Sequence, residues 1–313
     1  MNKPKFILKP AVIFALLALS GCSSLQPIAH VYSKQAPEPN YFRYQDDEIS
    51  IFYTFLVGDS AQPDTFIFFY GGSGCPSWKY VMPDYVNGLS ISARIFVLNK
   101  RFVSDRSTGM FGCKQGFHIA NNPDQWVVDY SEFITAQLKS IYHKPKNVGL
   151  VGVSEGSLPA VRIAGLIPEI THLAIIGDGG YPMRQVLTTL EKKNGIVIDI
   201  DSAWKNITAD PRSIEKSWLG HPYRYWSNVM DIDPLPDFLK LDIPIMVGIG
   251  EKDRNVPVES AYFLESEFKE AGKKNLLLVV YPGADHRLQS KGNHYRSDFF
   301  TKLGQLLQES HNK

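Results

Sequence analysis

The sequence predicts an α/β fold, in which a mostly parallel sheet is covered by helices on both faces. Short, largely apolar segments recur along the chain, at residues 65–70, 93–98, 147–153, 171–177, 243–250 and 275–281. Continuously apolar strands are typical of parallel sheets that are buried on both sides. Helical patterns separate several of these segments, and this alternation of strands and helices indicates a parallel sheet.

Each further element has a local reason in the sequence. Residues 49–57 are rich in β-branched and aromatic side chains, which favour a strand. Asn122 and Pro123 supply an N-cap and a proline for the first position of a helix. The apolar residues that follow recur at helical spacing, at Trp126, Val127, Tyr130, Phe133, Ile134, Leu138 and Ile141. We expect further helices after Pro257 and at residues 297–309.

One segment interrupts the alternation of strands and helices. Residues 194–237 contain aromatic side chains and prolines without a strand rhythm, among them Trp204, Trp218, Tyr223, Tyr225, Trp226 and Pro234. Such an insertion between two late strands is interpreted either as a lid or as a long surface segment that packs on the core. The sequence leaves both interpretations open.

The N-terminus has the composition of a targeting segment. The first nine residues contain three lysines, and the apolar run at residues 11–19 is too short to span a bilayer. The chain continues as Leu-Ser-Gly-Cys, ending at Cys22, and this sequence resembles the lipobox of bacterial lipoproteins. The resemblance implies that residues 1–21 are a signal peptide and that Cys22 carries lipid.

The residues after Cys22 indicate how the protein is anchored. Residues 22–40 contain three prolines among polar side chains, so we interpret them as a tether to a single domain at residues 41–313. Ser23, rather than aspartate, follows the cysteine, which by resemblance to Gram-negative sorting points to the outer membrane. We expect a protein of the bacterial envelope, held by lipid alone and facing the periplasm.

Cys75 and Cys113 remain as a pair if Cys22 carries lipid. An even pair in an oxidising compartment is a candidate disulfide, and the alternative is two free thiols. Both cysteines fall in loops that we expect at the C-terminal ends of neighbouring strands. We predict a disulfide that holds the glycine-rich turn immediately before Cys75.

The composition is that of an ordinary folded protein. The 313 residues are 44% apolar and 21% charged, and the formal net charge is +1. Without residues 1–21, which contain three lysines and no acid, the chain is slightly acidic. A nucleic-acid partner requires a basic face, so we expect none.

The sequence Gly-Val-Ser-Glu-Gly at residues 152–156 matches the G-x-S-x-G pattern. A buried strand precedes it and a helical pattern follows it, so Ser154 is expected at the tip of a sharp strand-to-helix turn. Glycines on both sides let the chain pass closely while the hydroxyl projects. We predict that Ser154 is a nucleophile, and the alternative is a plain turn.

A serine nucleophile needs a base, and the base needs an acid that orients it. His286 follows the last strand, at the sheet edge where catalytic side chains of open α/β sheets collect. Asp253 follows the strand at 243–250, and Asp178 follows the strand at 171–177. Both aspartates fit the chain order serine, acid, histidine; Asp253 is favoured because it lies in a loop directly after its strand, with a helix expected beyond it, and Asp178 is the alternative acid.

Acyl transfer also needs donors for a developing oxyanion. A turn with the sequence Gly-Gly-Ser-Gly, at residues 71–74, leaves the strand at 65–70. Glycines allow backbone N–H groups to face a substrate oxygen. We predict an oxyanion hole formed by the N–H of Gly72 or Ser73 together with the N–H of Glu155. The alternative is that residues 71–74 are only a tight turn.

Three short motifs resemble the α/β-hydrolase superfamily: GVSEG at 152–156, GEKDRNVP at 250–257 and GADH at 283–286. They occur in this order, each after a strand, within a layout that spans residues 45–310. The GGSG turn is similar to the H-G-x-x oxyanion loops of that superfamily, with Tyr70 where histidine is common. The resemblance implies a triad of Ser154, Asp253 and His286 and, often, a lid before the strand that carries the acid. We expect no cofactor and no metal.

One segment departs from the superfamily pattern. Relatives often carry a D-x-x-G-x-G-x-S loop after the strand that corresponds to 93–98, whereas this chain has Asn-Lys-Arg-Phe at 99–102 and a longer loop. We therefore transfer no substrate preference from peptidase or lipase relatives.

Three functions are compatible with these residues. The leading hypothesis is a serine hydrolase that cleaves ester or related acyl bonds of a small-molecule or peptide substrate through an acyl-enzyme. The second is a peptidase with the same mechanism. The third is a non-catalytic envelope lipoprotein with a hydrolase-like fold, and the presence of every triad candidate argues against it.

Overall fold

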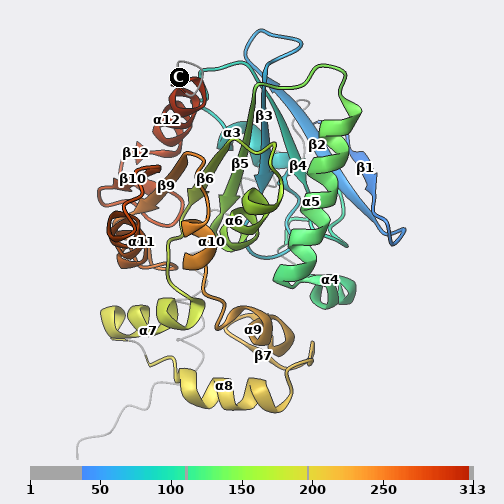
Figure 1. Ribbon diagram of the computed structural model, residues 1–313. Coiled ribbons are helices and arrows are strands. Elements are labelled where there is room, and N and C mark those ends of the chain that lie inside the picture. Colours follow the sequence, from blue (N-terminus) through green and yellow to red (C-terminus); the bar gives the residue numbers. More distant parts are fainter. Residues whose placement is uncertain (1–36, 110–111, 196, 310–313) are drawn as a thin grey trace, which may run out of the picture.

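The computed structural model describes residues 37–109, 112–195 and 197–309, so the predicted signal peptide and Cys22 lie outside the described residues. Its centre is an eight-stranded sheet in the order β1-β2-β4-β3-β5-β6-β9-β10 (Figure 1). These strands are β1 (Asn40–Arg43), β2 (Ile49–Val57), β3 (Thr65–Tyr70), β4 (Ala93–Leu98), β5 (Asn147–Val153), β6 (His172–Ile176), β9 (Ile245–Gly250) and β10 (Leu276–Tyr281). β2 runs antiparallel to β1 and β4, and the other neighbours are parallel. The predicted mostly parallel sheet is confirmed.

The central strands are buried on both faces, as their apolar sequences predict. Every residue of β3, β5, β6 and β9 is buried. Successive side chains of a strand point to opposite faces, so Phe66 and Phe68 of β3 join one apolar core while Ile67 and Phe69 join the other. The sheet therefore separates two cores, each of which needs a covering layer of helices.

Helices supply both layers. The helices are α3 (Met82–Tyr85), α4 (Gln115–Ala120), α5 (Pro123–Ser140), α6 (Ser157–Leu166), α7 (Met183–Asn194), α8 (Ile200–Ala209), α9 (Tyr223–Val229), α10 (Leu235–Leu239), α11 (Glu259–Glu270) and α12 (Arg296–Glu309). α5, α6 and α11 contribute buried side chains to the first core, and α3 and α12 contribute to the second. α5 begins at the predicted N-cap, where Asn122 Oδ1 accepts a hydrogen bond of 3.0 Å from the Gln125 N–H.

A further helical layer, residues 183–229, lies beyond the C-terminal ends of β3 and β5 (Figure 1). We call it the cap; it contains α7, α8, α9 and a short hairpin of β7 (Ser217–Trp218) and β8 (His221–Pro222). The cap covers most of the segment 194–237 but starts earlier, with α7 at Met183. Its aromatic residues pack on one another: Trp226 is buried, and its Nε1 donates to the Trp218 carbonyl at 2.6 Å.

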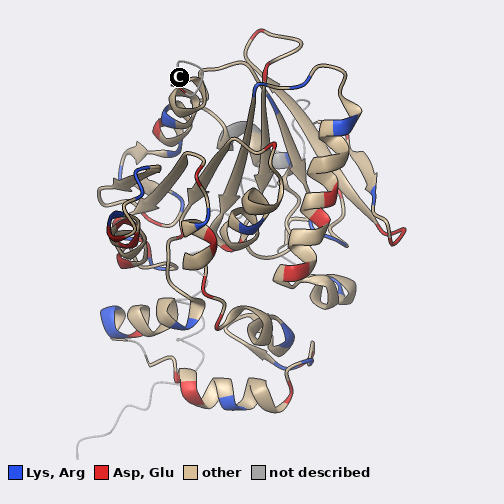
Figure 2. Ribbon diagram, in the orientation of Figure 1, with Lys and Arg blue, Asp and Glu red and all other residues tan. Residues whose placement is uncertain are grey.

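Charged side chains of both signs occur together on the outer helices. In Figure 2, α5, α11 and α12 each carry acidic and basic residues. Across the ranges that the structure describes, no helix is both long and apolar enough to cross a membrane.

Candidate active site

Ser154 occupies a sharp turn between β5 and α6. Its φ is +52°, a left-handed conformation that non-glycine residues rarely adopt. The flanking glycines are required by close contacts: a Cβ on Gly152 would lie 2.7 Å from the Gly156 carbonyl oxygen. A Cβ on Gly156 would lie 2.6 Å from the carbonyl oxygen of Gly71. The G-x-S-x-G pattern thus forms a tight strand-to-helix turn that presents the serine.

Ser154 is the first member of a hydrogen-bonded chain of three side chains. His286 Nε2, in the loop after β10, lies 2.9 Å from Ser154 Oγ. His286 Nδ1 lies 2.7 Å from Asp253 Oδ2, in the loop after β9. With its proton on Nδ1, the imidazole donates to the carboxylate and leaves Nε2 free to accept from the serine hydroxyl. The arrangement can remove the serine proton.

The carboxylate of Asp253 is held from its other side. Its Oδ1 accepts from the N–H groups of Asn255, at 2.8 Å, and Val256, at 3.0 Å. The side chain is fully inaccessible to solvent. Backbone donors and burial therefore keep the carboxylate in the orientation that faces His286.

Asp178 lies near this chain but does not join it. Its Oδ1 accepts from the Gly179 N–H at 2.8 Å, and no hydrogen bond links it to His286 among the described residues. Burial raises the pKa of Asp178 to about 7, and the charge of Asp253 adds to the rise, whereas the Gly179 N–H and His286 oppose it. Of the two candidate acids, the geometry brings Asp253 to the histidine.

The histidine ring lies directly over Gly177, at the end of β6. A Cβ at Gly177 would lie 2.9 Å from His286 Cε1, and the residue has a φ of +69°. Both facts demand glycine. Sequence reasoning missed Gly177, although a glycine immediately after a buried strand is a usable signal.

The turn at residues 71–74 passes beside the nucleophile. A Cβ on Gly72 would lie 3.3 Å from the Val153 carbonyl oxygen and 3.5 Å from Ser154 Cβ. The N–H groups of Gly72, Ser73 and Glu155 donate to no side chain or loop carbonyl in the described part of the chain. Gly72 therefore lies beside the nucleophile, Ser73 follows it in the same turn, and Glu155 directly follows Ser154.

A disulfide ties this turn to the long loop that follows β4. Cys75 and Cys113 are bonded, with their Cα atoms 5.7 Å apart. Ser107 Oγ, from the same loop, donates to the Cys75 carbonyl at 2.6 Å. The predicted disulfide is confirmed, and it follows the glycine-rich turn immediately.

Glu155 contributes more than a backbone N–H. Its carboxylate is buried and forms an ion pair with Lys100, whose Nζ also donates to the Gly72 carbonyl at 3.0 Å. The same Nζ lies 4.8 Å from the centre of the Trp126 ring. The segment at 99–102 departs from the superfamily pattern, and this role of Lys100 was not predicted from the sequence. Its position directly beyond a buried strand was the available signal.

The cap reaches the same region. His221 stacks on Tyr225 with ring centres 4.2 Å apart. Burial raises the pKa of Tyr225 well above its ordinary value, and the nearby charge of Glu155 raises it further. Burial also lowers the pKa of His221. The cap thus places two aromatic, polar residues close to the side chain that follows the nucleophile.

The side chains that commonly bind metal ions do not form a cluster in the described parts of the chain. Within residues 37–309, leaving aside the gaps, no three His, Cys, Asp or Glu side chains come close enough to hold a metal ion.

Solved structures with this arrangement of sheet and helices include esterases and a peptidase. Est1E from Butyrivibrio proteoclasticus superposes with a TM-score of 0.59 at 14% identity, over 88% of this chain and 99% of that one. An esterase from Pyrococcus furiosus gives 0.59 at 14%, over 98% and 97% of the two chains. An acylaminoacyl peptidase from Pyrococcus horikoshii gives 0.59 at 13%, over 89% of this chain but 42% of that one. These likenesses identify the α/β-hydrolase fold.

Sequence comparison identifies the family. A search of curated proteins found no significant match to this sequence. Residues 115–309, from α4 to the end of α12, match the prolyl oligopeptidase family. This match spans more than half of the chain and includes Ser154, Asp253 and His286, so the protein is a hydrolase-fold member of the prolyl oligopeptidase family.

Proposed function

We propose that the protein is a serine hydrolase that cleaves ester or related acyl bonds through a Ser154–His286–Asp253 triad. The observation that carries this proposal is the continuous hydrogen-bonded chain, 2.9 Å from Ser154 Oγ to His286 Nε2 and 2.7 Å from His286 Nδ1 to Asp253 Oδ2. Both distances suit proton transfer and orientation of the base.

In the first half of the reaction, Ser154 Oγ forms a bond to the acyl carbon while its proton passes to His286 Nε2. The carbonyl oxygen becomes an oxyanion, which accepts hydrogen bonds from the N–H of Glu155 and from that of Gly72 or Ser73. Asp253 stabilises the imidazolium. The bond to the leaving group then breaks, and His286 returns its proton to the departing oxygen or nitrogen, which leaves an acyl-enzyme.

In the second half, His286 removes a proton from water, whose oxygen bonds to the acyl carbon. A second oxyanion forms in the same position, the bond to Ser154 Oγ breaks, and the proton returns from His286 to the serine. The products are a carboxylic acid and an alcohol, or an amine if the substrate is an amide. No cofactor enters this sequence of steps.

A peptidase with the same mechanism is the second candidate, because the family match carries the name of a peptidase family. The structural relatives include both an esterase and an acylaminoacyl peptidase. Rates on p-nitrophenyl esters of graded chain length, compared with rates on aminoacyl arylamides, separate the two. Higher kcat/KM on arylamides than on any ester would favour the peptidase.

We further propose that the mature protein begins at lipidated Cys22 and acts in the bacterial envelope, on the outer membrane and facing the periplasm. The lipobox-like sequence at residues 19–22 supports this proposal. The domain would then meet small-molecule or peptide acyl substrates of that compartment, with residues 194–237 acting as a lid.

A serine-directed fluorophosphonate tests the proposed chemistry. The folded protein should be labelled at Ser154, and Ser154→Ala should lose labelling and about 10³-fold or more of turnover with an unchanged fold. His286→Ala should be similarly inactive, and the double variant should be little worse, because the residues act as a unit. Absence of labelling in the folded protein would support a non-catalytic, binding role instead.

A further inference from the structure

Resting on the proposed function, we infer that Lys100 is a positioning residue that holds the two halves of the oxyanion hole in register. One ammonium group contacts both halves: Lys100 Nζ donates to the Gly72 carbonyl at 3.0 Å and forms an ion pair with the carboxylate of Glu155. Gly72 belongs to the glycine-rich turn, and Glu155 directly follows the nucleophile.

The strand order explains how one side chain reaches both. β4, β3 and β5 are consecutive neighbours in the sheet, and β3 and β4 run parallel, as do β3 and β5. Their C-terminal ends therefore lie side by side. Lys100 follows β4, Gly72 follows β3 and Glu155 follows β5. The lysine bridges the ends of three strands that are far apart in the sequence.

The contact with the Gly72 carbonyl fixes an N–H as well as an oxygen. The peptide group is planar, so the Gly72 carbonyl and the Ser73 N–H share one rigid plane. A hydrogen bond that holds the carbonyl therefore also sets the direction of the Ser73 N–H. Glycines otherwise leave this turn many conformations, and oxyanion donors must be oriented before the charge develops.

The ion pair with Glu155 acts on the other donor. The side chains of Lys100 and Glu155 are 10% and 4% exposed, so each charge is largely shielded from water and is stabilised by the other. The pair holds the residue whose N–H is the second donor. One Nζ makes both contacts, so a displacement of Gly72 or of Glu155 would weaken the contact with the other residue.

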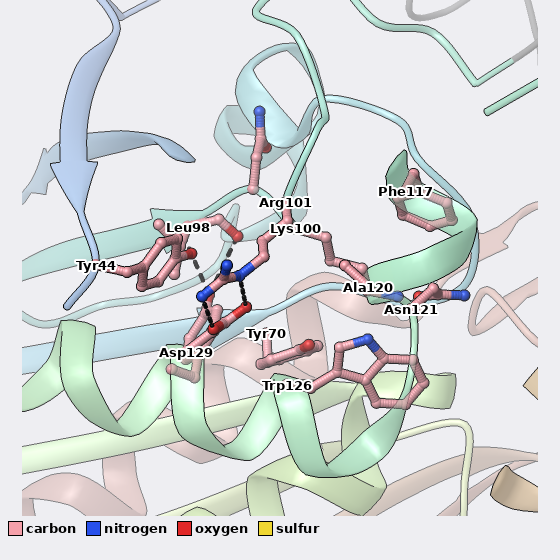
Figure 3. Close-up of a pocket in the computed structure, with 12 residues that line it drawn as sticks. Tyr44, Tyr70, Leu98, Lys100, Arg101, Phe117, Ala120, Asn121, Trp126 and Asp129 are labelled. Carbon is pink, nitrogen blue, oxygen red and sulfur yellow. Dashed lines mark hydrogen bonds and ion pairs between the residues drawn. The ribbon is translucent and has the colours of Figure 1, made fainter. Parts of the chain in front are cut away.

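The backbone on both sides of Lys100 is anchored. Asn99 is fully buried, and its Oδ1 accepts from the Trp78 N–H at 3.2 Å. Arg101 forms a bidentate ion pair with Asp129 of α5, in which each of the two hydrogen bonds is 2.8 Å long (Figure 3). The backbone that carries the flexible Lys100 side chain is thus held in place on both sides, and the ammonium group lies over the Trp126 ring. Such mounting suits a residue that positions other groups.

Steady-state kinetics of Lys100→Met with p-nitrophenyl acetate test this role. We expect kcat to fall roughly 10–100-fold, less than the ~10²–10³-fold that follows loss of a whole oxyanion donor. KM should change by less than about threefold, because the lost contact acts on the transition state. Affinity for a trifluoromethyl ketone, whose serine adduct places an oxyanion in the hole, should fall in parallel with kcat.

Two further variants separate positioning from stability. Lys100→Met combined with Glu155→Gln leaves no unpaired buried charge, so it keeps the test open if Lys100→Met alone does not fold. Its loss of kcat should be close to that of Lys100→Met rather than the sum of the single losses, because the two residues act together. Lys273→Met is the matched control: it removes a largely buried lysine paired with Asp242 at the opposite ends of the strands, and its kcat should not change.

The outcomes distinguish this inference from the proposed function. Folded Lys100 variants with kcat and ketone affinity within twofold of the unaltered protein would overturn the positioning role. A fall in kcat without a matching loss of ketone affinity would overturn it as well. Failure of the unaltered protein to react with the fluorophosphonate would instead overturn the proposed function.

Discussion

The Cα of Gly177 lies against the imidazole of His286. A Cβ at this position would stand 2.9 Å from Cε1 and 3.1 Å from Nδ1 of the ring. The ring can keep its hydrogen bonds to Ser154 and Asp253 only because the backbone beneath it carries no side chain. The geometry of the triad thus depends on a residue that takes no part in the chemistry.

We predict that Gly177→Ala lowers kcat by roughly 10²-fold, because a displaced base loses its alignment with the nucleophile. The positive φ should also reduce the free energy of unfolding by about 1–2 kcal/mol. Gly272→Ala is a matched control, with a φ of +70° and nothing within 4 Å of the added Cβ. It should show a similar loss of stability in urea unfolding but unchanged kcat. Equal kcat for the two variants would contradict the prediction.

The two candidate acids are predicted to differ in their effect on turnover. Asp253→Asn removes the carboxylate that faces His286 Nδ1 and should lower kcat by roughly 10³–10⁴-fold. Asp178→Asn changes a group that has no hydrogen bond to the histidine in the described structure, so its effect should be mild. Kinetics of both folded variants at pH 8 provide the comparison. The reverse ranking would move the orienting role to Asp178.

Asp178 should also make stability depend on pH. Because its pKa is raised to about 7 in the folded protein, the folded state holds a proton that the unfolded chain has lost between about pH 4 and 7. Its contribution is present at low pH and is lost as the pH rises through 7. Asparagine does not titrate, so Asp178→Asn lacks this loss. The free energy of unfolding of Asp178→Asn minus that of the unaltered protein, both from urea unfolding, should therefore be larger at pH 8 than at pH 5. An equal difference at both pH values would count against a raised pKa.

The disulfide between Cys75 and Cys113 is predicted to act on turnover as well as on stability. Closing this long loop should stabilise the fold by about 2–4 kcal/mol on a chain-entropy account. Cys113→Ser should also make the glycine-rich turn at residues 71–74 more mobile and lower kcat by roughly 3–10-fold. This is a smaller fall in kcat than the one that follows removal of a whole oxyanion donor. Melting temperature and kcat, measured below the melting transition, separate the two effects. Unchanged kcat in the folded variant would limit the disulfide to stability.

Cys22→Ser should block lipidation and release the protein from the membrane fraction. The motivation is the Leu-Ser-Gly-Cys sequence that ends at Cys22, after the short apolar run. A single change at the proposed lipidation site removes the only anchor that we propose. Membrane fractionation and metabolic labelling with palmitate test it. A variant that stays in the membrane pellet would argue for a different mode of attachment.

Some features follow from the sequence because they are local. The apolar runs predicted the parallel strands, since strands that are buried on both faces of a sheet consist largely of apolar residues. The glycines at 152 and 156 predicted a tight turn with Ser154 at its tip, because only glycine tolerates such contacts. Cys75 and Cys113 predicted a disulfide as an even pair, on the expectation of an oxidising compartment and of positions after neighbouring strands. For the strands and for the turn at Ser154, a few adjacent residues carried the physical requirement.

Other features were decided only by the tertiary structure, because they join residues from different strands. Asp253 and Asp178 both follow buried strands, and the sequence could only favour one; the fold brings Asp253 to 2.7 Å from the histidine. Lys100 gains its contacts with Gly72 and Glu155 because β4, β3 and β5 end side by side. Local sequence sets which backbone can turn and which segment is buried, whereas strand order determines which distant side chains meet.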